Sequence, residues 1–329
     1  MCLYPKLIKN KKYTITKKNN GIIPMIKDER TLYVPVGCGK CIECMNKKAR
    51  EWQIRLYEEI KTTSEMKFVT LTFSEESLIK LEKETKFKNT KKILGNEIAT
   101  TGVRKFLERW RKEFKTSVKH WLVTELGHNG TERIHLHGVI FSDDEDAIIK
   151  NWKYGYIYFG TYVNEQTINY IVKYVNKIDN DHKGYIPKIL TSAGIGKNYL
   201  NRIDAKNNKY KGKETKEYYR TKKGNKINLP IYYRNKIYTE EERESLWLNK
   251  LDEEKRYICG EKIDISQNEV DYYKNLEFYR AKNKRLGYGD DSKEWSTEEY
   301  KKQRAMLKYI KKYNKSKVNE QVKKEKSIG

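Results

Sequence analysis

The chain has 329 residues, of which 37% are hydrophobic, 12% aromatic and 35% charged, enough for one large domain or two modest ones. Its 70 Lys and Arg against 45 Asp and Glu give a net charge of +25, which indicates a polyanionic partner, most commonly nucleic acid. There is no apolar run of about 18 residues and no secretory leader, so we expect a cytoplasmic protein without a membrane span. Structural disulfides are unfavourable in that compartment.

The N-terminal region is expected to combine a polar, irregular arm at residues 1–37 with a cluster of cysteines. Cys38, Cys41 and Cys44 form a C-x2-C-x2-C pattern, and Cys2 would supply a fourth thiolate. Four thiolates are typical of a structural zinc site, which would fix an arm that has no core of its own. An iron–sulfur cluster also fits close thiol spacing, but the usual downstream Cys-Pro is absent from the sequence.

Beyond the arm, hydrophobic residues recur with alternating helical and strand periodicity. The expected elements, in chain order, are a helix at 44–61, a strand at 67–73, a short helix and charged loop at 76–99, a helix at 103–114, strands at 121–126 and 133–141, a short helix at 145–152, a strand at 155–161 and a helix at 165–178. Asn129-Gly130 between two of the strands predicts a hairpin.

The β-α-β-β-α-β order predicts an α+β fold of the ferredoxin-like, split βαβ type. We expect an antiparallel sheet with helices on one face, and an open second face that can hold nucleic acid and a metal. The predicted division is a Cys-rich arm and helix at 1–61, the core at 62–200, and a basic, partly flexible extension at 201–329. From about residue 297 that extension is expected to form a basic amphipathic helix.

The segment Arg133-Ile134-His135-Leu136-His137-Gly138 contains two of the five histidines of the chain. Because strand side chains alternate between faces, the two imidazoles point the same way and can chelate one metal ion. His120 and His182 are expected to be ordinary packing or surface histidines, and Cys259 a packed thiol.

Glu125 on the preceding strand is the candidate third ligand. A two-residue turn would place it opposite Ile134, on the wrong face, whereas a three-residue or bulged turn places it opposite His135. We predict the shifted register, and His128 in the turn is the alternative ligand. Two histidines and a carboxylate suit Mn²⁺ or Mg²⁺ and also zinc, while a phosphate substrate favours Mg²⁺ or Mn²⁺.

The helix expected at 165–178 carries four polar residues on the arc opposite its apolar face, namely Tyr170, Lys173, Tyr174 and Lys177. The two tyrosines are four residues apart, one above the other, and each is followed three residues later by a lysine. A lysine there can stabilise a phenolate and pair with a phosphate, so these four residues are candidate catalytic residues.

These segments, in this order, resemble the HUH endonucleases, which include rolling-circle replication initiators, conjugative relaxases and related transposases. They are most similar to the replication initiators of microviruses, the small single-stranded DNA phages of the gokushovirus type. The resemblance covers about residues 1–250 and departs from the family pattern at Val36 and Gly37, which are inserted before Cys38. The shared segments are Cys2, Val34 to Cys44, Trp52 to Arg55, the Arg-x-His-x-His-Gly strand, Tyr-x-x-Lys-Tyr, Leu190 to Gly196 and Leu229 to Tyr233.

The resemblance implies a metal-dependent DNA endonuclease and strand transferase. Tyr170 or Tyr174 would attack a phosphodiester of single-stranded origin DNA, and Mg²⁺ or Mn²⁺ at the two histidines and Glu125 would polarise that phosphate. The products would be a 5′-phosphotyrosine and a free 3′-OH for a host polymerase, and the second tyrosine would attack after one round. The sequence contains no Gly-x4-Gly-Lys-Ser/Thr loop, so a host helicase would be a partner and no nucleotide cofactor is expected.

Three other functions are compatible with parts of the pattern. A non-catalytic single-stranded nucleic-acid binder would use charge and stacking, but would need neither the paired histidines nor the polar-face tyrosines. A relaxase or single-strand transposase would use the same chemistry. A zinc-ribbon regulator would use the cysteine cluster and leave most of the chain unexplained.

Overall fold

A computed structural model of the chain describes residues 2–85, 91–127, 132–179, 181–182, 184–290 and 295–328. The structure divides into two compact units. Unit 1 comprises Met1–Cys44, Tyr210–Thr215 and Tyr238–Gly329, and unit 2 comprises Met45–Lys209 and Lys216–Ile237. These units do not coincide with the three consecutive segments expected from the sequence.

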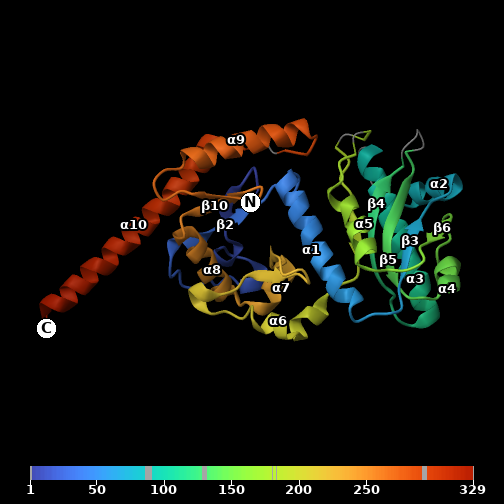
Figure 1. Cartoon of the computed structure of the whole chain (residues 1–329), viewed down its shortest axis with the longest axis horizontal. Helices are drawn as coiled ribbons and strands as arrows, with labels where there is room; N and C mark the ends of the chain where they lie inside the picture. The colour runs from blue at the N-terminus through green and yellow to red at the C-terminus, as the bar shows by residue number, and fades with distance from the viewer. Residues whose placement is uncertain are drawn as a thin grey trace. The chain divides into compact units, whose positions relative to one another are not determined.

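Unit 2 is built around a five-stranded antiparallel sheet in the order β6-β3-β5-β4-β7 (Figure 1). Its strands are β3 (Lys67–Leu71), β4 (Lys119–Leu126), β5 (Ile134–Phe141), β6 (Ile157–Phe159) and β7 (Ile189–Thr191), with a separate pair β8 (Tyr218–Arg220) and β9 (Lys226–Asn228). Its helices are α1 (Ile42–Ile60) from Met45 onward, α2 (Glu75–Glu84), α3 (Lys91–Phe114), α4 (Glu145–Asn151), α5 (Glu165–Asn176), α6 (Ile203–Lys206) and α7 (Ile231–Ile237). The expected mixture of helices with an antiparallel sheet is therefore confirmed, and β7 adds a strand that was not predicted.

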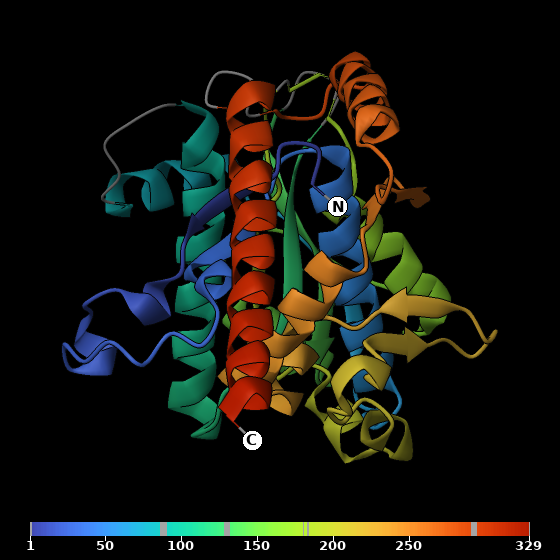
Figure 2. The same ribbon diagram turned by 90° about the vertical axis from the view of Figure 1, so that its left-hand side faces the viewer.

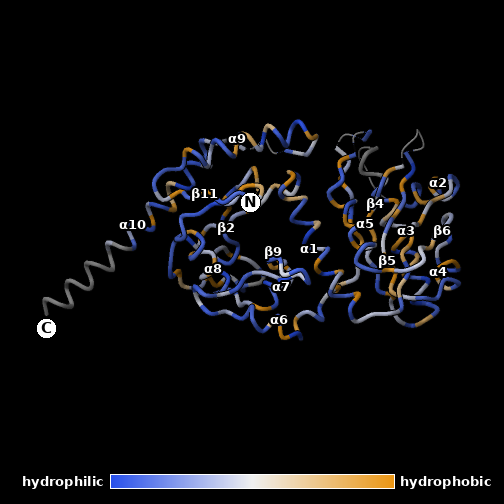
Figure 3. Tube along the Cα trace, viewed as in Figure 1, coloured by the Kyte–Doolittle hydropathy of each residue, from blue (hydrophilic) through white to orange (hydrophobic). Residues whose placement is uncertain are grey.

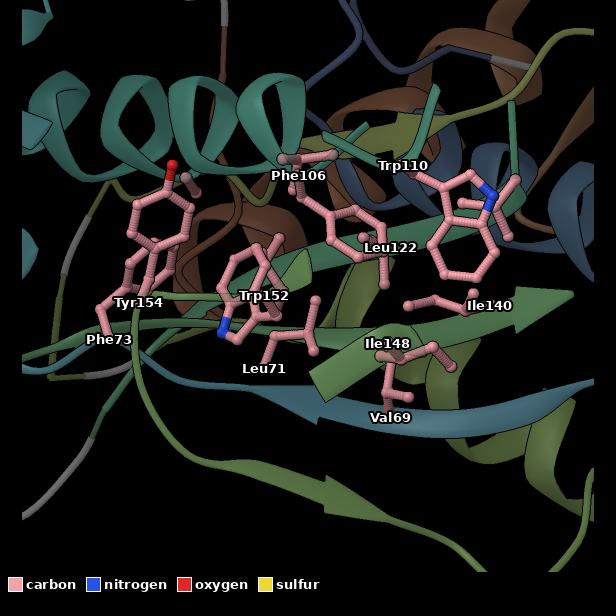
Figure 4. Packing of buried hydrophobic residues seen from close by; sticks show 14 of the residues in the cluster. Val69, Leu71, Phe73, Phe106, Trp110, Leu122, Ile140, Ile148, Trp152 and Tyr154 are labelled. Atoms are coloured by element: carbon pink, nitrogen blue, oxygen red, sulfur yellow. The ribbon is translucent and has the colours of Figure 1, made fainter. Parts of the chain in front are cut away.

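One face of the sheet packs against α2, α3 and α4. Phe106 and Trp110 project from α3 toward Leu122 of β4 and Ile140 of β5, beside Trp152 (Figure 4). Alternate strand residues point into this layer, as the period of two requires. The layer forms because the apolar face of α3 repeats every three to four residues and so presents one continuous stripe to the strands.

The other face of the sheet packs against α1 and α5, so the expectation of helices on one face only is wrong. The strand residues Trp121, Val123 and Val139 on this face are fully buried and need a cover of their own. Figure 1 shows α3 and α5 on opposite sides of the strands. The covering helix residues are Ala49, Leu56, Ile168, Ile171, Val172 and Val175.

Unit 1 joins the two ends of the chain. It contains β1 (Lys6–Lys9) paired with β2 (Tyr33–Val36), the start of α1, α8 (Glu240–Asp252), β10 (Lys255–Ile258) paired with β11 (Glu261–Asp264), α9 (Val270–Arg285) and α10 (Thr297–Ile328). The arm expected to be irregular thus contains a strand pair, and its Leu3 and Tyr4 are buried in one core with Ile258 and Trp295.

The expected C-terminal helix is confirmed: α10 runs unbroken in Figure 2, where it is drawn in red. The hydropathy colouring in Figure 3 shows hydrophobic residues gathered on the strands of unit 2 and on the helices beside them. Within the described residues, no helix combines the length and apolar character needed to cross a membrane.

Gly138 allows β4 and β5 to approach closely. It lies opposite Leu122, and a Cβ at this position would overlap the backbone carbonyl oxygen of Trp121 and lie 2.8 Å from the Cα of Leu122. The glycine that ends the paired-histidine motif is therefore required by backbone packing.

We predict that Gly138→Ala lowers the free energy of unfolding by at least about 2 kcal/mol, because rigid backbone atoms must move to admit the methyl group. Gly95→Ala is the matched control, since its Cβ would meet only side-chain atoms at 3.7 Å or more. Alanine in that helix should be neutral or stabilising. Urea unfolding followed by circular dichroism measures both, and an unchanged midpoint for Gly138→Ala would contradict the close-approach argument.

Candidate active site

The register of the β4–β5 pair brings Glu125 beside the two histidines. Glu125 lies directly opposite His135, so the shifted register predicted from the sequence is confirmed. His137 is two residues further along β5 and lies on the same face of the sheet. The alternative ligand His128 and the expected Asn129-Gly130 turn lie outside the described residues.

Three ligand atoms converge at this point. The Oε2 atom of Glu125 lies 3.1 Å from Nε2 of His135 and 2.8 Å from Nε2 of His137. All three ligand atoms lie within 4.8 Å of one another, close enough to hold one metal ion. The carboxylate is largely shielded from solvent, with 12% of its side chain exposed.

The proton positions on His135 favour a cation in this group. Its Nδ1 lies 3.2 Å from the backbone carbonyl oxygen of Arg133, which only accepts hydrogen bonds, so Nδ1 carries the proton. In the neutral ring, Nε2 then presents a lone pair toward the carboxylate of Glu125. Two electron-pair donors that face each other fit a divalent ion between them, so the donor set suits a metal.

Thr70 orients the second imidazole and was not predicted as a site residue. It pairs with His137 across the β3–β5 ladder, and its hydroxyl oxygen lies 3.0 Å from Nδ1 of His137. This contact leaves Nε2 of His137 directed at Glu125. The sequence signal, a threonine within the strand 67–73, becomes readable only when the pairing of β3 with β5 is known.

Lys177 joins the site from the end of α5. Its ammonium group donates to Oε1 of Glu125 at 2.8 Å, while its backbone N–H caps the helix by donating to the carbonyl oxygen of Lys173. Burial raises the pKa of the Glu125 carboxyl, but hydrogen bonds from His135, His137 and Lys177 together lower it well below its ordinary value. The carboxylate therefore stays ionised at neutral pH and is available as a ligand.

The two tyrosines of α5 lie against the same group. The ring of Tyr174 stacks on His137 with centroids 4.4 Å apart and planes 9° apart. The hydroxyl groups of Tyr170 and Tyr174 are 2.6 Å apart, and 47% of Tyr170 is exposed. Burial, the Tyr170 hydroxyl and the charge of Glu125 all raise the pKa of Tyr174, so its phenol is protonated unless a cation acts on it.

Local sequence fixes the orientation of α5. The side chain of Asn164 accepts hydrogen bonds from the backbone N–H groups of Gln166 and Thr167, which satisfies the first turn of the helix. The apolar arc then packs on the sheet and turns the tyrosines toward the site. Of the two predicted lysines, Lys177 contacts Glu125, whereas Lys173 is exposed and is not among the described residues that contact the triad.

Three further motif segments meet in unit 2 and serve packing. The guanidinium of Arg55 lies between the rings of Trp52 and Tyr232, 4.1 Å from each centroid, and donates to the carbonyl oxygen of Ile195. The Tyr233 hydroxyl donates to the carbonyl oxygen of Gly196 at 2.8 Å.

Buried carboxylates complete this packing. Glu59 is fully buried and accepts from the backbone N–H of Gly196, while Lys119 pairs with its other oxygen. The remaining predicted packing histidines agree with this pattern: His120 is buried beside Ser192, and His182 bonds to Asp179.

The four N-terminal cysteines form a second group of possible ligands. The Sγ atoms of Cys2, Cys38, Cys41 and Cys44 all lie within 4.8 Å of one another, with 3.9 Å between Cys2 and Cys41. A tetrahedral zinc with bonds of about 2.3 Å sets its sulfurs about 3.8 Å apart, so this spacing fits. Backbone N–H groups of Tyr4, Cys38 and Cys41 also point at these sulfurs, as expected for thiolates. Cys259 lies apart from this group and packs against the core of unit 1, as expected.

Comparison with known proteins places this site within a replication-associated region. Residues 66–179, which contain the triad and both tyrosines, match the profile of a family of replication-associated proteins, the ORF2 family. The expected relationship to rolling-circle replication initiators is therefore confirmed for this part of the chain. The nearer likeness to microvirus initiators is not tested by this match and stays a prediction.

A solved structure, the catalytic domain of the Adeno Associated Virus type 5 Rep protein, is similar at 16% identity. The match covers 43% of this chain and 82% of that one, with a TM-score of 0.18, a likeness too low to carry an argument. No curated protein matches the chain.

We predict that Thr70→Val lowers the affinity for Mn²⁺ about 10- to 100-fold, because the valine cannot hold the ring of His137 in its ligating orientation. Isothermal titration calorimetry of the metal-free protein measures this. The control is Thr100→Val, which removes a hydroxyl that donates to the carbonyl oxygen of Asn96 in α3. Equal affinities for Thr70→Val and wild type would exclude the orienting role.

Proposed function

We propose that this protein initiates rolling-circle replication by nicking single-stranded origin DNA with a tyrosine and remaining joined to the 5′ end. One observation carries the proposal: two phenols in mutual hydrogen-bond contact lie against a group of two histidines and a carboxylate. A non-catalytic binder has no use for that combination. The family match over residues 66–179 supports the same function.

The topology of unit 2 also supports a nuclease core of the ferredoxin-like type. The order β6-β3-β5-β4 with antiparallel neighbours is the order that two split βαβ units produce. The strand β7 extends this sheet at the β4 edge. The site lies on β3, β4 and β5, the rigid centre of the sheet, which suits precise placement of reacting groups.

Glu125, His135 and His137 would hold Mg²⁺ or Mn²⁺. When bound, such an ion supplies Lewis-acid polarisation of a phosphate oxygen. Hard phosphate oxygens favour these ions over zinc at this site. Lys177 adds a positive charge on the side of Glu125 that faces α5, and lies 5.5 Å from the ring centroid of Tyr174.

The reaction is a transesterification that conserves the number of phosphodiester bonds. The phenolic oxygen of Tyr170 or Tyr174 attacks the phosphorus, the bond to the 3′ oxygen breaks, and the phenolic proton is finally replaced by one on that oxygen. The products are a 5′-phosphotyrosine and a 3′-OH that a host polymerase can extend. No nucleotide is consumed, because the new bond stores the energy of the old one.

Two tyrosines allow the protein to exchange one strand for another. The second hydroxyl lies 2.6 Å from the first, so the free phenol is already beside the reacting phosphate when the next origin copy arrives. Its attack would release a unit-length strand for closure. Lys173 would bind DNA phosphate from the exposed side of α5, and a host helicase would open the duplex.

We predict that wild-type protein, incubated with Mn²⁺ and end-labelled single-stranded oligonucleotides tiling its own genome, forms a labelled covalent adduct on a denaturing gel. The adduct should be absent with EDTA. Each single variant, Tyr170→Phe and Tyr174→Phe, should reduce the yield or rate, and the double variant should abolish it, because no phenol remains to attack phosphorus.

Two controls give this experiment its meaning. Tyr162→Phe removes an exposed hydroxyl from the loop before α5 and should leave the adduct unchanged. Binding of the oligonucleotides without any covalent species, in every tile and with every metal tried, would overturn the nuclease proposal and leave a single-stranded DNA binder.

We further propose that Cys2, Cys38, Cys41 and Cys44 bind one structural zinc ion. The sulfur spacing and the inward backbone N–H groups support this, and the cluster packs against the core of unit 1. The ion would then link the first residues of the chain to the start of α1. No catalytic role follows, because four protein ligands leave no open position for a substrate.

We predict that purified protein contains one zinc per chain, and that Cys41→Ser, at the most buried of the four positions, loses the metal and lowers the melting temperature. Elemental analysis and thermal denaturation measure the two effects. Cys259→Ser is the control and should retain the metal. A Cys41→Ser protein with full zinc content would overturn the assignment.

A further inference from the structure

Two tyrosines stand exposed at the β6 edge of the sheet. Tyr158 is 53% exposed and Tyr156 is 73% exposed. Tyr156 continues the strand ladder, since its carbonyl oxygen accepts from the backbone N–H of Thr72. Being two residues apart on an extended strand, the two rings project from the same face. Ile157 and Phe159, between and after them, pack into the opposite layer with α3.

A row of ring contacts leads from this edge to the tyrosine pair of α5. The ring of Tyr158 meets Phe68 at 6.4 Å between centroids, and Phe68 meets Tyr170 at 6.1 Å, both edge to face. Tyr170 in turn meets Tyr174 at 5.4 Å. Aromatic surface is therefore continuous from the β6 edge to the proposed nucleophiles.

The exposed tyrosines are not explained by packing. Phe68 is 9% exposed and belongs to the core, whereas Tyr156 and Tyr158 lie outside both core clusters of unit 2. On the same side, Tyr162 is 68% exposed and Lys173 presents a charge beside Tyr170. Exposed rings beside an ammonium group are what single-stranded nucleic acid requires, because bases stack on rings and phosphates pair with lysine.

We propose that Tyr156 and Tyr158 form a stacking platform for the bases of the single-stranded DNA next to the cleaved phosphate. This inference rests on the proposed function, because it takes its direction from the position of Tyr170 and Tyr174. The platform holds the strand along β6 and so delivers the adjoining phosphate to the triad. Stacking accepts any base, so the platform supplies affinity and alignment rather than recognition of a sequence.

Binding of a labelled (dT)20 oligonucleotide to the full chain, measured by fluorescence anisotropy in EDTA, tests the platform without cleavage. We expect Tyr158→Ala and Tyr156→Ala each to weaken binding by about 5-fold or more, the loss typical of one stacked base. Tyr158→Phe keeps the ring and should bind like wild type. Tyr257→Ala, which removes a 46% exposed tyrosine of unit 1, should also bind like wild type.

A 20-mer of abasic nucleotides separates stacking from charge. It carries the same phosphates but offers no base, so Tyr158→Ala should bind it as well as wild type does. Equal loss on both oligonucleotides, or wild-type binding of (dT)20 by both alanine variants, would overturn the platform. Failure of the proposed function looks different, since wild type would then bind (dT)20 and lose affinity on Tyr158→Ala without forming a covalent adduct on any tile.

Discussion

The chemistry of this molecule depends on the pairing of β4 with β5. Only one register places Glu125 opposite His135 and on the same face as His137, and a slip by one residue would send the carboxylate to the opposite layer. Gly138 makes that register possible by letting the backbone of Trp121 approach. Metal ligation and strand packing are thus consequences of the same hydrogen-bonded ladder.

The helices on the second face turn this ladder into a reaction site. α1 and α5 cover Trp121, Val123 and Val139, and the cover ends where the ligands begin. The same α5 that seals the core therefore presents Tyr170 and Tyr174 at its border. Segments that resemble those of replication initiators divide accordingly: one set makes the reacting group, and another, around α1, holds the layer in place.

Local periodicity was enough to predict the histidine pair, the polar face of α5 and most elements of the core, because each depends on residues close in sequence. The choice of Glu125 depended on the length of a turn, which spacing alone left open. Thr70 could not be found, since its role arises from a strand pairing over nearly 70 positions. The strand β7 has three residues, too few for a periodic signal, and the core shared by Leu3 and Trp295 joins opposite ends of the chain.

Lys177 gives the last turn of α5 an influence beyond its own stability. Its backbone closes the helix while its ammonium group holds Glu125, and its neighbour in the same turn, Tyr174, covers His137. Helix ends open by local unfolding far more often than the whole protein does. When this turn frays, the carboxylate loses its cation partner and the imidazole loses its cover in a single event. The site should therefore open and close cooperatively, and amide exchange in the final turn would report how often the reactive arrangement is assembled.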